Sequence, residues 1–363
     1  MKNFHCGRCG GQIFFDSVTC VRCGAMLGYL PLECTMAGFE PAAEGNHWQR
    51  VGGEAAGRLY KQCANYGQHG VCNCVLDAED QEELCPCCRL TAIIPSLVSE
   101  QNLAYWHSLE AAKRWLLYSL QSMRLDPFRA QADGSPEMRF QFMESGLADG
   151  EITTGHYDGL ITINLAEADP VERERHKEDM GEPYRTLLGH FRHESGHFYF
   201  QKLIAESNWL EGFRECFGDE RADYGASLER YYAEKRFNLK DDSFVTTYAG
   251  SHPWEDWAET WAHYLHVVDT METAYACGLG LKPRHAEEPT LSPSPNTLLS
   301  GAFGRIGGDW LALSYVLNNL NRSMGLPDAY PFTLSETVLE KLAFVHRVVL
   351  AQRAPRTARP RAM

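Results

Sequence analysis

The spacing of apolar and polar residues changes near Pro95 and divides the chain into two unequal parts. Beyond this point, apolar residues recur at intervals of three and four over Leu103–Met123, which predicts a long amphipathic helix. Alternation over Arg139–Met143 and Leu160–Leu165 predicts two strands, and the stretch from about Tyr184 to Ile204 predicts another helix. The larger part of the chain is therefore expected to be mainly helical, with a small sheet.

The part before Pro95 follows a different pattern. Gln12–Phe15 resembles a short strand between two cysteine pairs. Residues Pro31–Leu59 are rich in Gly, Ala and Glu and have little periodicity, which predicts an extended connector with short strands. The fold class predicted for the whole chain is α+β, with β-rich modules at the N-terminus followed by a mainly helical domain.

The composition narrows the classes of function. The 363 residues are 44% hydrophobic and 23% charged, as in ordinary globular proteins. The net charge is −14, and the first hundred residues are also acidic, which argues against nucleic-acid binding. No apolar run approaches the roughly 18–20 residues of a membrane span, and no apolar segment of a secretory signal precedes the first cysteines. We therefore expect a cytoplasmic protein with no membrane partner, ending in a disordered tail over 351–363.

Two C-x-x-C-G pairs near the N-terminus indicate a metal site. Without a secretory signal, this spacing favours metal binding over disulfides for the 13 cysteines. Each pair forms a tight turn that aims two thiolates at one ion, and the glycine accepts the unusual backbone angle. Four thiolates leave no position for water, so the pairs predict a structural zinc ribbon held by Cys6, Cys9, Cys20 and Cys23.

A second group of six cysteines exceeds the four that a tetrahedral zinc site needs. Because Cys85 and Cys88 form a C-x-x-C pair, the predicted ligands of a second structural zinc are Cys63, Cys72, Cys85 and Cys88. Cys74 and Cys87 are then expected not to be ligands. The alternative is a set of free buried thiols. Three isolated cysteines are expected only to be buried: Cys34, Cys216 and Cys277.

The stretch His193-Glu194-Ser195-Gly196-His197 carries the clearest chemistry in the chain. Residues four apart lie on one face of a helix, so both imidazoles can bind one Zn²⁺. The adjacent glutamate can then reach the water that the ion activates. This H-E-x-x-H pattern is typical of zinc peptidases, although an amphipathic helix with two solvated histidines would also contain it.

Two histidines leave such an ion short of one protein ligand. Metzincins supply a histidine six residues after the second ligand, with a glycine between, but Phe200 and Leu203 occupy those positions here. Beside an apolar stripe of tryptophans, Glu255 and Glu259 form a polar stripe that a bound cation would stabilise. The stretch Asp219–Asp223 is expected to start a helix, and its Asp219 is the rival third ligand.

Residues 248–259 resemble the gluzincins whose third ligand opens an E-x-x-A-E helix, as in anthrax lethal factor. Glu255-Asp256-Trp257-Ala258-Glu259 matches that element, and Tyr248 lies seven residues before it. The resemblance implies that Glu255 is the third zinc ligand and that Tyr248 stabilises the oxyanion. Glu259 then fits a residue that holds a ligand histidine in the required tautomer.

A broader resemblance covers nearly the whole chain. The chain is similar to bacterial zinc-binding metallopeptidases with an N-terminal zinc ribbon. The matching segments are the ribbon, Cys63–Tyr66, Arg192–His197, Phe217–Tyr224, Ser251–Trp261 and Leu320–Met324. The resemblance implies a zinc ribbon over 1–30, a connector with a second cysteine-rich zinc module over 31–95, and a zincin-like metallopeptidase domain over 96–350.

These observations predict a zinc-dependent metallopeptidase with one catalytic and two structural Zn²⁺ ions. Its substrate is a peptide or protein, Glu194 acts as general base, and Tyr248 assists the transition state. The zinc ribbon could also bind a protein partner. The alternative function is a catalytically inactive adaptor protein with a peptidase-like domain.

Overall fold

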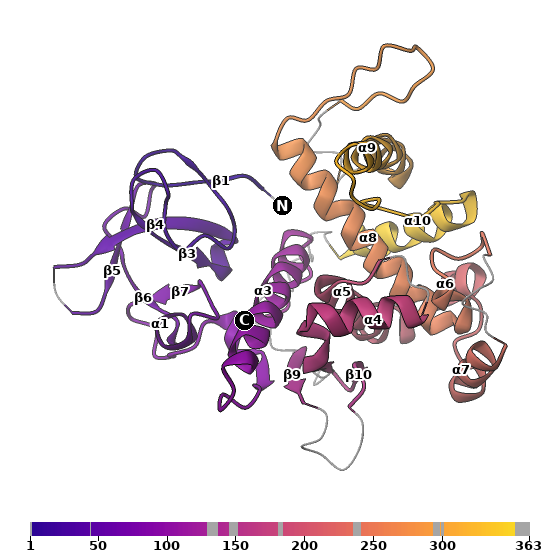
Figure 1. The fold of residues 1–363 in the computed structure, drawn as a ribbon, viewed down its shortest axis with the longest axis horizontal. Helices are drawn as coiled ribbons and strands as arrows, with labels where there is room; N and C mark the ends of the chain where they lie inside the picture. Colours follow the sequence, from indigo (N-terminus) through magenta and orange to yellow (C-terminus); the bar gives the residue numbers. More distant parts are fainter. Residues whose placement is uncertain are drawn as a thin grey trace, which may run out of the picture.

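The protein has an α+β fold, as the sequence predicts, in which a strand-rich N-terminal part lies beside a larger helical part (Figure 1). The computed structural model describes residues 2–43, 45–128, 137–144, 152–180, 184–234, 241–292, 298 and 301–352. Apart from its first two residues, the predicted tail at 351–363 lies outside the described residues. None of the described helices is both long enough and apolar enough to cross a membrane.

The N-terminal part contains a two-stranded and a five-stranded antiparallel sheet, the latter in the order β3-β4-β5-β6-β7. The strands are β1 (Phe4–His5), β2 (Gln12–Ile13), β3 (Met26–Leu30), β4 (Thr35–Pro41), β5 (Trp48–Val51), β6 (Leu59–Gln62) and β7 (Val75–Asp77). Two short helices, α1 (Ala64–His69) and α2 (Pro86–Arg89), each begin directly after a cysteine.

The segment predicted as an extended connector with short strands contains β4 and β5, which belong to the five-stranded sheet. Four consecutive residues of β4, Met36 to Phe39, are buried because both faces of this strand are covered. A strand that is buried on both faces shows no alternation of apolar and polar residues. This explains why the sequence pattern did not show where β4 begins and ends.

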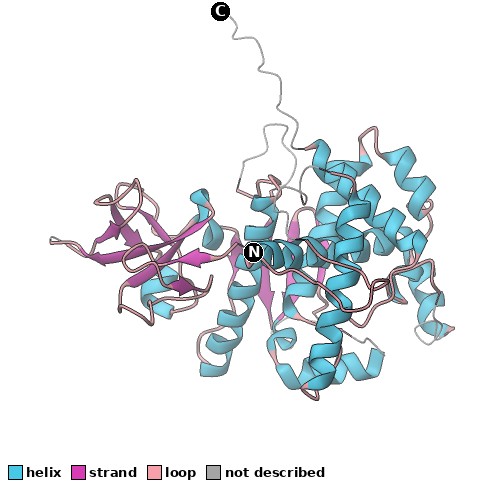
Figure 2. Cartoon of the chain, turned by 90° about the horizontal axis from the view of Figure 1, so that it is seen from above, coloured by secondary structure: helices cyan, strands magenta, loops and turns pink. Residues whose placement is uncertain are grey.

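The larger part contains a four-stranded sheet in the order β10-β11-β9-β8. The two strands expected from alternation are present as β9 (Arg139–Met143) and β11 (Leu160–Asn164), which pair in parallel. The outer strands are β8 (Thr91–Ile93) and β10 (Gly155–Tyr157). Figure 2 shows this small sheet among the helices of the larger part.

Long helices make up most of the larger part. The helix expected over Leu103–Met123 is α3 (Glu100–Ser122). The helix expected from about Tyr184 begins later, at Leu187, because Thr186 caps it by accepting a hydrogen bond from Gly189 N. It forms α5 (Leu187–Phe200) and continues as one turn of π-helix (Gln201–Ala205). The others are α4 (Pro170–Met180), α6 (Leu210–Phe217), α7 (Tyr224–Ala233), α8 (Pro253–Ala276), α9 (Phe303–Ser323) and α10 (Glu336–Ala351).

Helices α5 and α8 approach each other unusually closely. A Cβ atom placed on Gly196 would lie only 2.9 Å from Ala258 Cα, so glycine permits this contact. Trp257 Nε1 donates to Gly196 O at 2.9 Å, and Trp261 Nε1 donates to Ser195 Oγ at 3.0 Å. Both tryptophans are fully buried, and the contact fixes how the H-E-x-x-H helix faces α8.

The two parts of the protein share one continuous core, with α3 as the connection between them. The ring of Phe15 packs 5.4 Å from that of Trp115 and 5.6 Å from that of Tyr118. Trp115 Nε1 donates to Asp16 Oδ2 at 3.0 Å, and Arg114 Nη1 donates to Val71 O at 2.7 Å. The cysteine-rich part is thus packed firmly against the helical part.

Candidate metal centres and active site

Two histidines and one glutamate meet at the contact between α5 and α8. His193 and His197 lie one turn apart on α5, and Glu255 lies in the first turn of α8. His193 Nε2 and His197 Nε2 are 3.2 Å apart, and Glu255 Oε2 lies 3.0 Å and 3.5 Å from them, respectively. Ligands bound to tetrahedral zinc at about 2.0–2.1 Å lie about 3.3 Å from one another. The three atoms are therefore spaced as ligands of one ion.

The environment of Glu255 also fits a bound cation. Its side chain is 1% exposed, and among the described residues Oε2 faces only the two histidine nitrogens. Burial alone would raise the pKa of Glu255, but His197 and His193 outweigh burial and lower this pKa well below its usual value. A metal ligand must be ionised, so Glu255 is in the form that Zn²⁺ needs.

Glu259 holds His193 from the opposite side of the ring. Glu259 lies one turn after Glu255, and its Oε1 is 2.6 Å from His193 Nδ1. Its Oε2 accepts a hydrogen bond from Thr246 Oγ1 at 2.7 Å. A carboxylate at Nδ1 orients the ring and places the proton there, which leaves Nε2 for a metal. This is the contact that the sequence predicts for Glu259.

Glu194 is a buried carboxylate beside these ligands. Its Oε2 has no hydrogen-bond partner within the described ranges. Burial and the charge of Glu255 raise the pKa of Tyr224, and the charge of Glu194 adds to this effect. A carboxylate oxygen without a partner is expensive to bury unless a water or substrate group meets it.

The first cysteine group has the geometry of a closed zinc centre. The Cys6–Cys23 and Cys9–Cys20 sulfur pairs are both separated by 3.7 Å. Thiolates bound to tetrahedral zinc at about 2.3 Å lie about 3.8 Å apart. Gly11 N–H also donates to Cys9 Sγ at 3.4 Å, as expected when the sulfur carries negative charge.

The second group is similar but more crowded. The Sγ atoms of four buried cysteines lie within 4.8 Å of one another, namely Cys63, Cys72, Cys85 and Cys88. Cys72 Sγ and Cys85 Sγ are 3.8 Å apart, and Cys88 N–H donates to Cys85 Sγ at 3.4 Å. Cys74 and Cys87, which the sequence predicts not to be ligands, also lie in this group, because both Sγ atoms are within 4.8 Å of Cys85 Sγ.

Comparison with known proteins agrees with this arrangement of metal centres. Residues 102–348 match the family model described as "Putative zinc-binding metallo-peptidase", and residues 3–99 match a zinc-ribbon domain. The chain belongs to this zinc-binding family. Uncharacterized proteins of Mycobacterium tuberculosis and Mycobacterium bovis are 40% identical to it over 350 residues, which is 96% of this chain and 95% of theirs. No solved structure matches the chain.

The structure places Glu255, and not Asp219, beside the two histidines. Asp219 lies on an exposed loop between α6 and α7, where its Oδ2 pairs with Arg221 Nη2 at 2.7 Å. Hydrogen bonds from Arg221 lower the pKa of Asp219. The stretch Asp219–Asp223 leads into a helix as expected, because Asp223 caps α7 and accepts a hydrogen bond from Ala226 N, but Asp219 itself lies on the loop before it.

Two tyrosines flank the ligands of this zinc-binding family member. The ring of Tyr248 lies 6.1 Å from that of His193, and burial followed by the charge of Glu255 raises its pKa. Tyr224 OH donates to Glu255 Oε1 at 2.8 Å. Sequence reasoning missed Tyr224 because it lies 31 residues before Glu255 on a separate helix, and no local spacing connects the two.

Two other histidines and the three isolated cysteines lie outside these metal groups. His190 Nε2 lies 3.1 Å from Glu167 Oε2, and His263 Nδ1 lies 2.7 Å from Tyr330 OH, so both histidines have polar partners. The expectation for the isolated cysteines is only partly right. Cys34 and Cys216 are half-buried, but Cys277 is exposed because α8 ends just before it.

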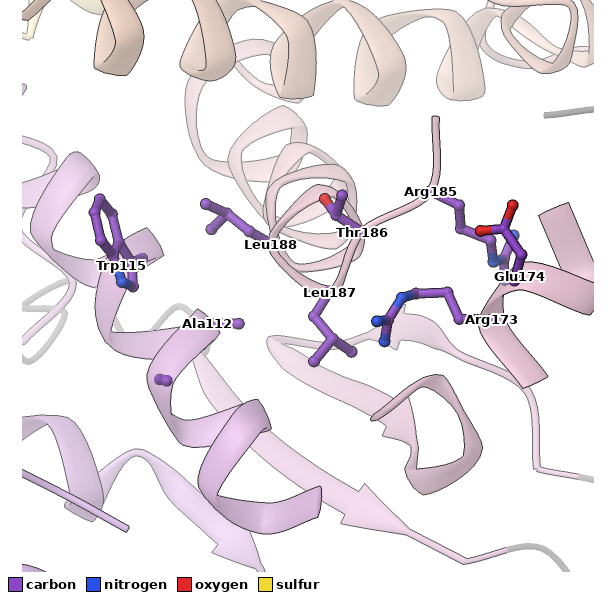
Figure 3. Close-up of a pocket in the computed structure, with 9 residues that line it drawn as sticks. Ala112, Trp115, Arg173, Glu174, Arg185, Thr186, Leu187 and Leu188 are labelled. Carbon is purple, nitrogen blue, oxygen red and sulfur yellow. The ribbon is translucent and has the colours of Figure 1, made fainter. Parts of the chain in front are cut away.

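A separate hollow of about 560 Å³ lies between α3, α4 and the start of α5 (Figure 3). Its lining includes Trp115, Arg173 and Arg185. Both arginines interact with Glu167: Arg173 Nη1 donates to its backbone oxygen, and Arg185 Nη2 to its Oε1. These interactions stabilise the fold, and the hollow contributes no group to the metal centre.

Proposed function

We propose that this protein is a zinc-dependent peptidase that hydrolyses peptide or protein substrates. The observation that carries the proposal is the spacing of 3.0–3.5 Å among His193 Nε2, His197 Nε2 and Glu255 Oε2, next to the buried carboxylate of Glu194. When bound, Zn²⁺ supplies a Lewis acid that lowers the pKa of water and polarises a carbonyl group.

Each surrounding residue has a distinct part in the proposed reaction. Glu194 accepts a proton from the attacking water and later donates it to the leaving amine. Glu259 keeps the ring of His193 oriented, and Tyr224 does the same for Glu255. Tyr248 stays protonated because its pKa is raised, and it donates to the oxyanion of the substrate.

The cysteine centres support the helical domain in this proposal. Two four-thiolate sites leave no position for a substrate. The zinc ribbon packs on α3 through Phe15 and Asp16, which lie between its two cysteine pairs. We propose that the N-terminal part braces the peptidase domain. Its outer surface could still bind a protein partner.

Glu194→Gln tests the proposed reaction. The full-length zinc-loaded protein should cleave members of a mixed library of unstructured peptides, detected by mass spectrometry. The variant should retain its zinc and cleave at least about a hundredfold more slowly, because it lacks the general base. Glu211→Gln, an exposed position on α6, is the matched control and should behave as wild type.

The two alternatives give different results in this experiment. Equal cleavage by Glu194→Gln and wild type would refute the role of Glu194. Cleavage by neither protein, with zinc present in both, would favour the inactive adaptor.

A further inference from the structure

All six cysteines of the second group are buried in one place, although one zinc ion needs only four. Their exposed fractions are 0–2%. One set of sulfurs, each within 4.8 Å of the others, consists of Cys63, Cys72, Cys85 and Cys88. A second such set consists of Cys74, Cys85 and Cys87. Cys85 belongs to both sets, so its sulfur lies between two possible ion positions.

We propose that this group binds two thiophilic metal ions that share the sulfur of Cys85. Cys63, Cys72 and Cys88 complete the first site, and Cys74 and Cys87 complete a three-thiolate second site. Zinc and copper(I) are the ions that such soft ligands select. The protein would then hold one ion more than the three that the sequence predicts.

Backbone donors support negative charge on the sulfurs of the first site. Cys74 N–H donates to Cys72 Sγ at 3.3 Å, and Cys85 N–H donates to Cys63 Sγ at 3.3 Å. Cys88 N–H donates to Cys85 Sγ at 3.4 Å. Cys74 thus supplies a backbone donor to the first site and a sulfur to the second. The segment Cys72–Cys74 therefore contributes to both proposed sites.

Two buried cations lie on α3, which packs against α2, the helix that carries Cys87 and Cys88. Lys113 Nζ lies 2.7 Å from Glu110 Oε2. Arg114 Nη1 donates to the backbone oxygen of Val71, the residue before Cys72, at 2.7 Å. Helix α3 thus brings positive charge to the segments that carry the cysteines of both proposed sites.

The balance of charge permits the second ion. Four thiolates around one divalent ion carry a net charge of minus two, and six thiolates around two such ions carry the same charge. Arg114 Nε has no hydrogen-bond partner among the described residues, and its nearest carboxylate, Asp16, is 3.9 Å away. Either number of zinc ions therefore leaves the same net negative charge on the thiolate group near the buried guanidinium of Arg114.

The ion count in the full-length protein tests the proposal. Native mass spectrometry and elemental analysis after loading with zinc should find four ions per chain. The double variant Cys74→Ser/Cys87→Ser should hold one ion fewer and keep the others. Cys34→Ser, which alters a half-buried cysteine outside both sets, is the control and should lose none.

A second measurement does not depend on how well the double variant folds. After substitution of ¹¹³Cd into the wild-type protein, two cadmium signals should be coupled through the shared sulfur. Three zinc ions in wild type, no change in the double variant, or a disulfide between Cys74 and Cys87 would each overturn the proposal.

Discussion

The cysteine centres and the histidine centre differ in the number of their protein ligands and in how far apart those ligands lie in the sequence. In the ribbon, ligands come in close pairs, and backbone N–H groups support the sulfurs, as Gly11 does for Cys9. In the helical part, His193 and His197 come from α5, whereas Glu255 comes from α8. Four thiolates would complete the coordination of a zinc ion, whereas two histidines and one glutamate would leave one position for water. We infer that the closed centres build the fold and that the open centre performs chemistry.

Removing one ligand from each kind of centre tests this contrast and should give the largest effect. Cys20→Ser should lose one zinc and destabilise the N-terminal part by several kcal/mol, out of the roughly 10–16 kcal/mol that structural zinc provides. Glu255→Gln should also lose one zinc but lower the melting temperature far less, because Trp257 and Trp261 still pack α8 against α5.

Elemental analysis measures the zinc content of the two variants, and circular dichroism during heating measures their melting temperatures. If Glu255→Gln were as destabilising as Cys20→Ser, the histidine centre would be structural as well.

Gly196→Ala should have an intermediate effect. The added Cβ would lie 2.9 Å from Ala258 Cα, a backbone atom that can move only if α5 and α8 separate. We expect a loss of about 1–3 kcal/mol in the free energy of unfolding and weaker zinc binding, because the ligands lie on opposite sides of this contact. Urea unfolding and a zinc-chelator competition measure the two effects.

Gly308→Ala is the control for this substitution. Gly308 is exposed on α9, and nothing lies within 4 Å of an added Cβ. This variant should gain up to about 1 kcal/mol from helix propensity and keep its zinc affinity. A Gly196→Ala protein with unchanged affinity would show that the contact does not position the ligands.

Glu259→Gln should have the smallest effect and should act on the open centre alone. Replacing the carboxylate beside His193 Nδ1 removes a charge-assisted hydrogen bond. Zinc affinity should fall about 10–100-fold, while the unfolding of the apoprotein changes little. Competition with a chromophoric chelator measures the affinity. Glu229→Gln, exposed on α7, should leave it unchanged, and equal affinities in both variants would exclude the proposed orienting role.

Much of the candidate site could be predicted because its parts lie close together in the sequence. The spacing of His193 and His197 determines that they share a helix face, and each C-x-x-C pair forms its own turn. The strands β9 and β11 were predictable from alternation for the same local reason. The buried strand β4 shows no alternation, so its place in a sheet could not be predicted.

The sequence by itself determined the metal-binding chemistry, the α+β class and the family, since residue type and local spacing carry that information. Tertiary structure decided between the two candidates from the sequence: Glu255 lies beside the histidines, whereas Asp219 pairs with Arg221 on an exposed loop. It also decided that Tyr224 donates a hydrogen bond to Glu255 and that the sulfurs of Cys74 and Cys87 lie within 4.8 Å of that of Cys85. The reason is physical: these contacts join separate elements, and only the packing of those elements brings them within bonding distance.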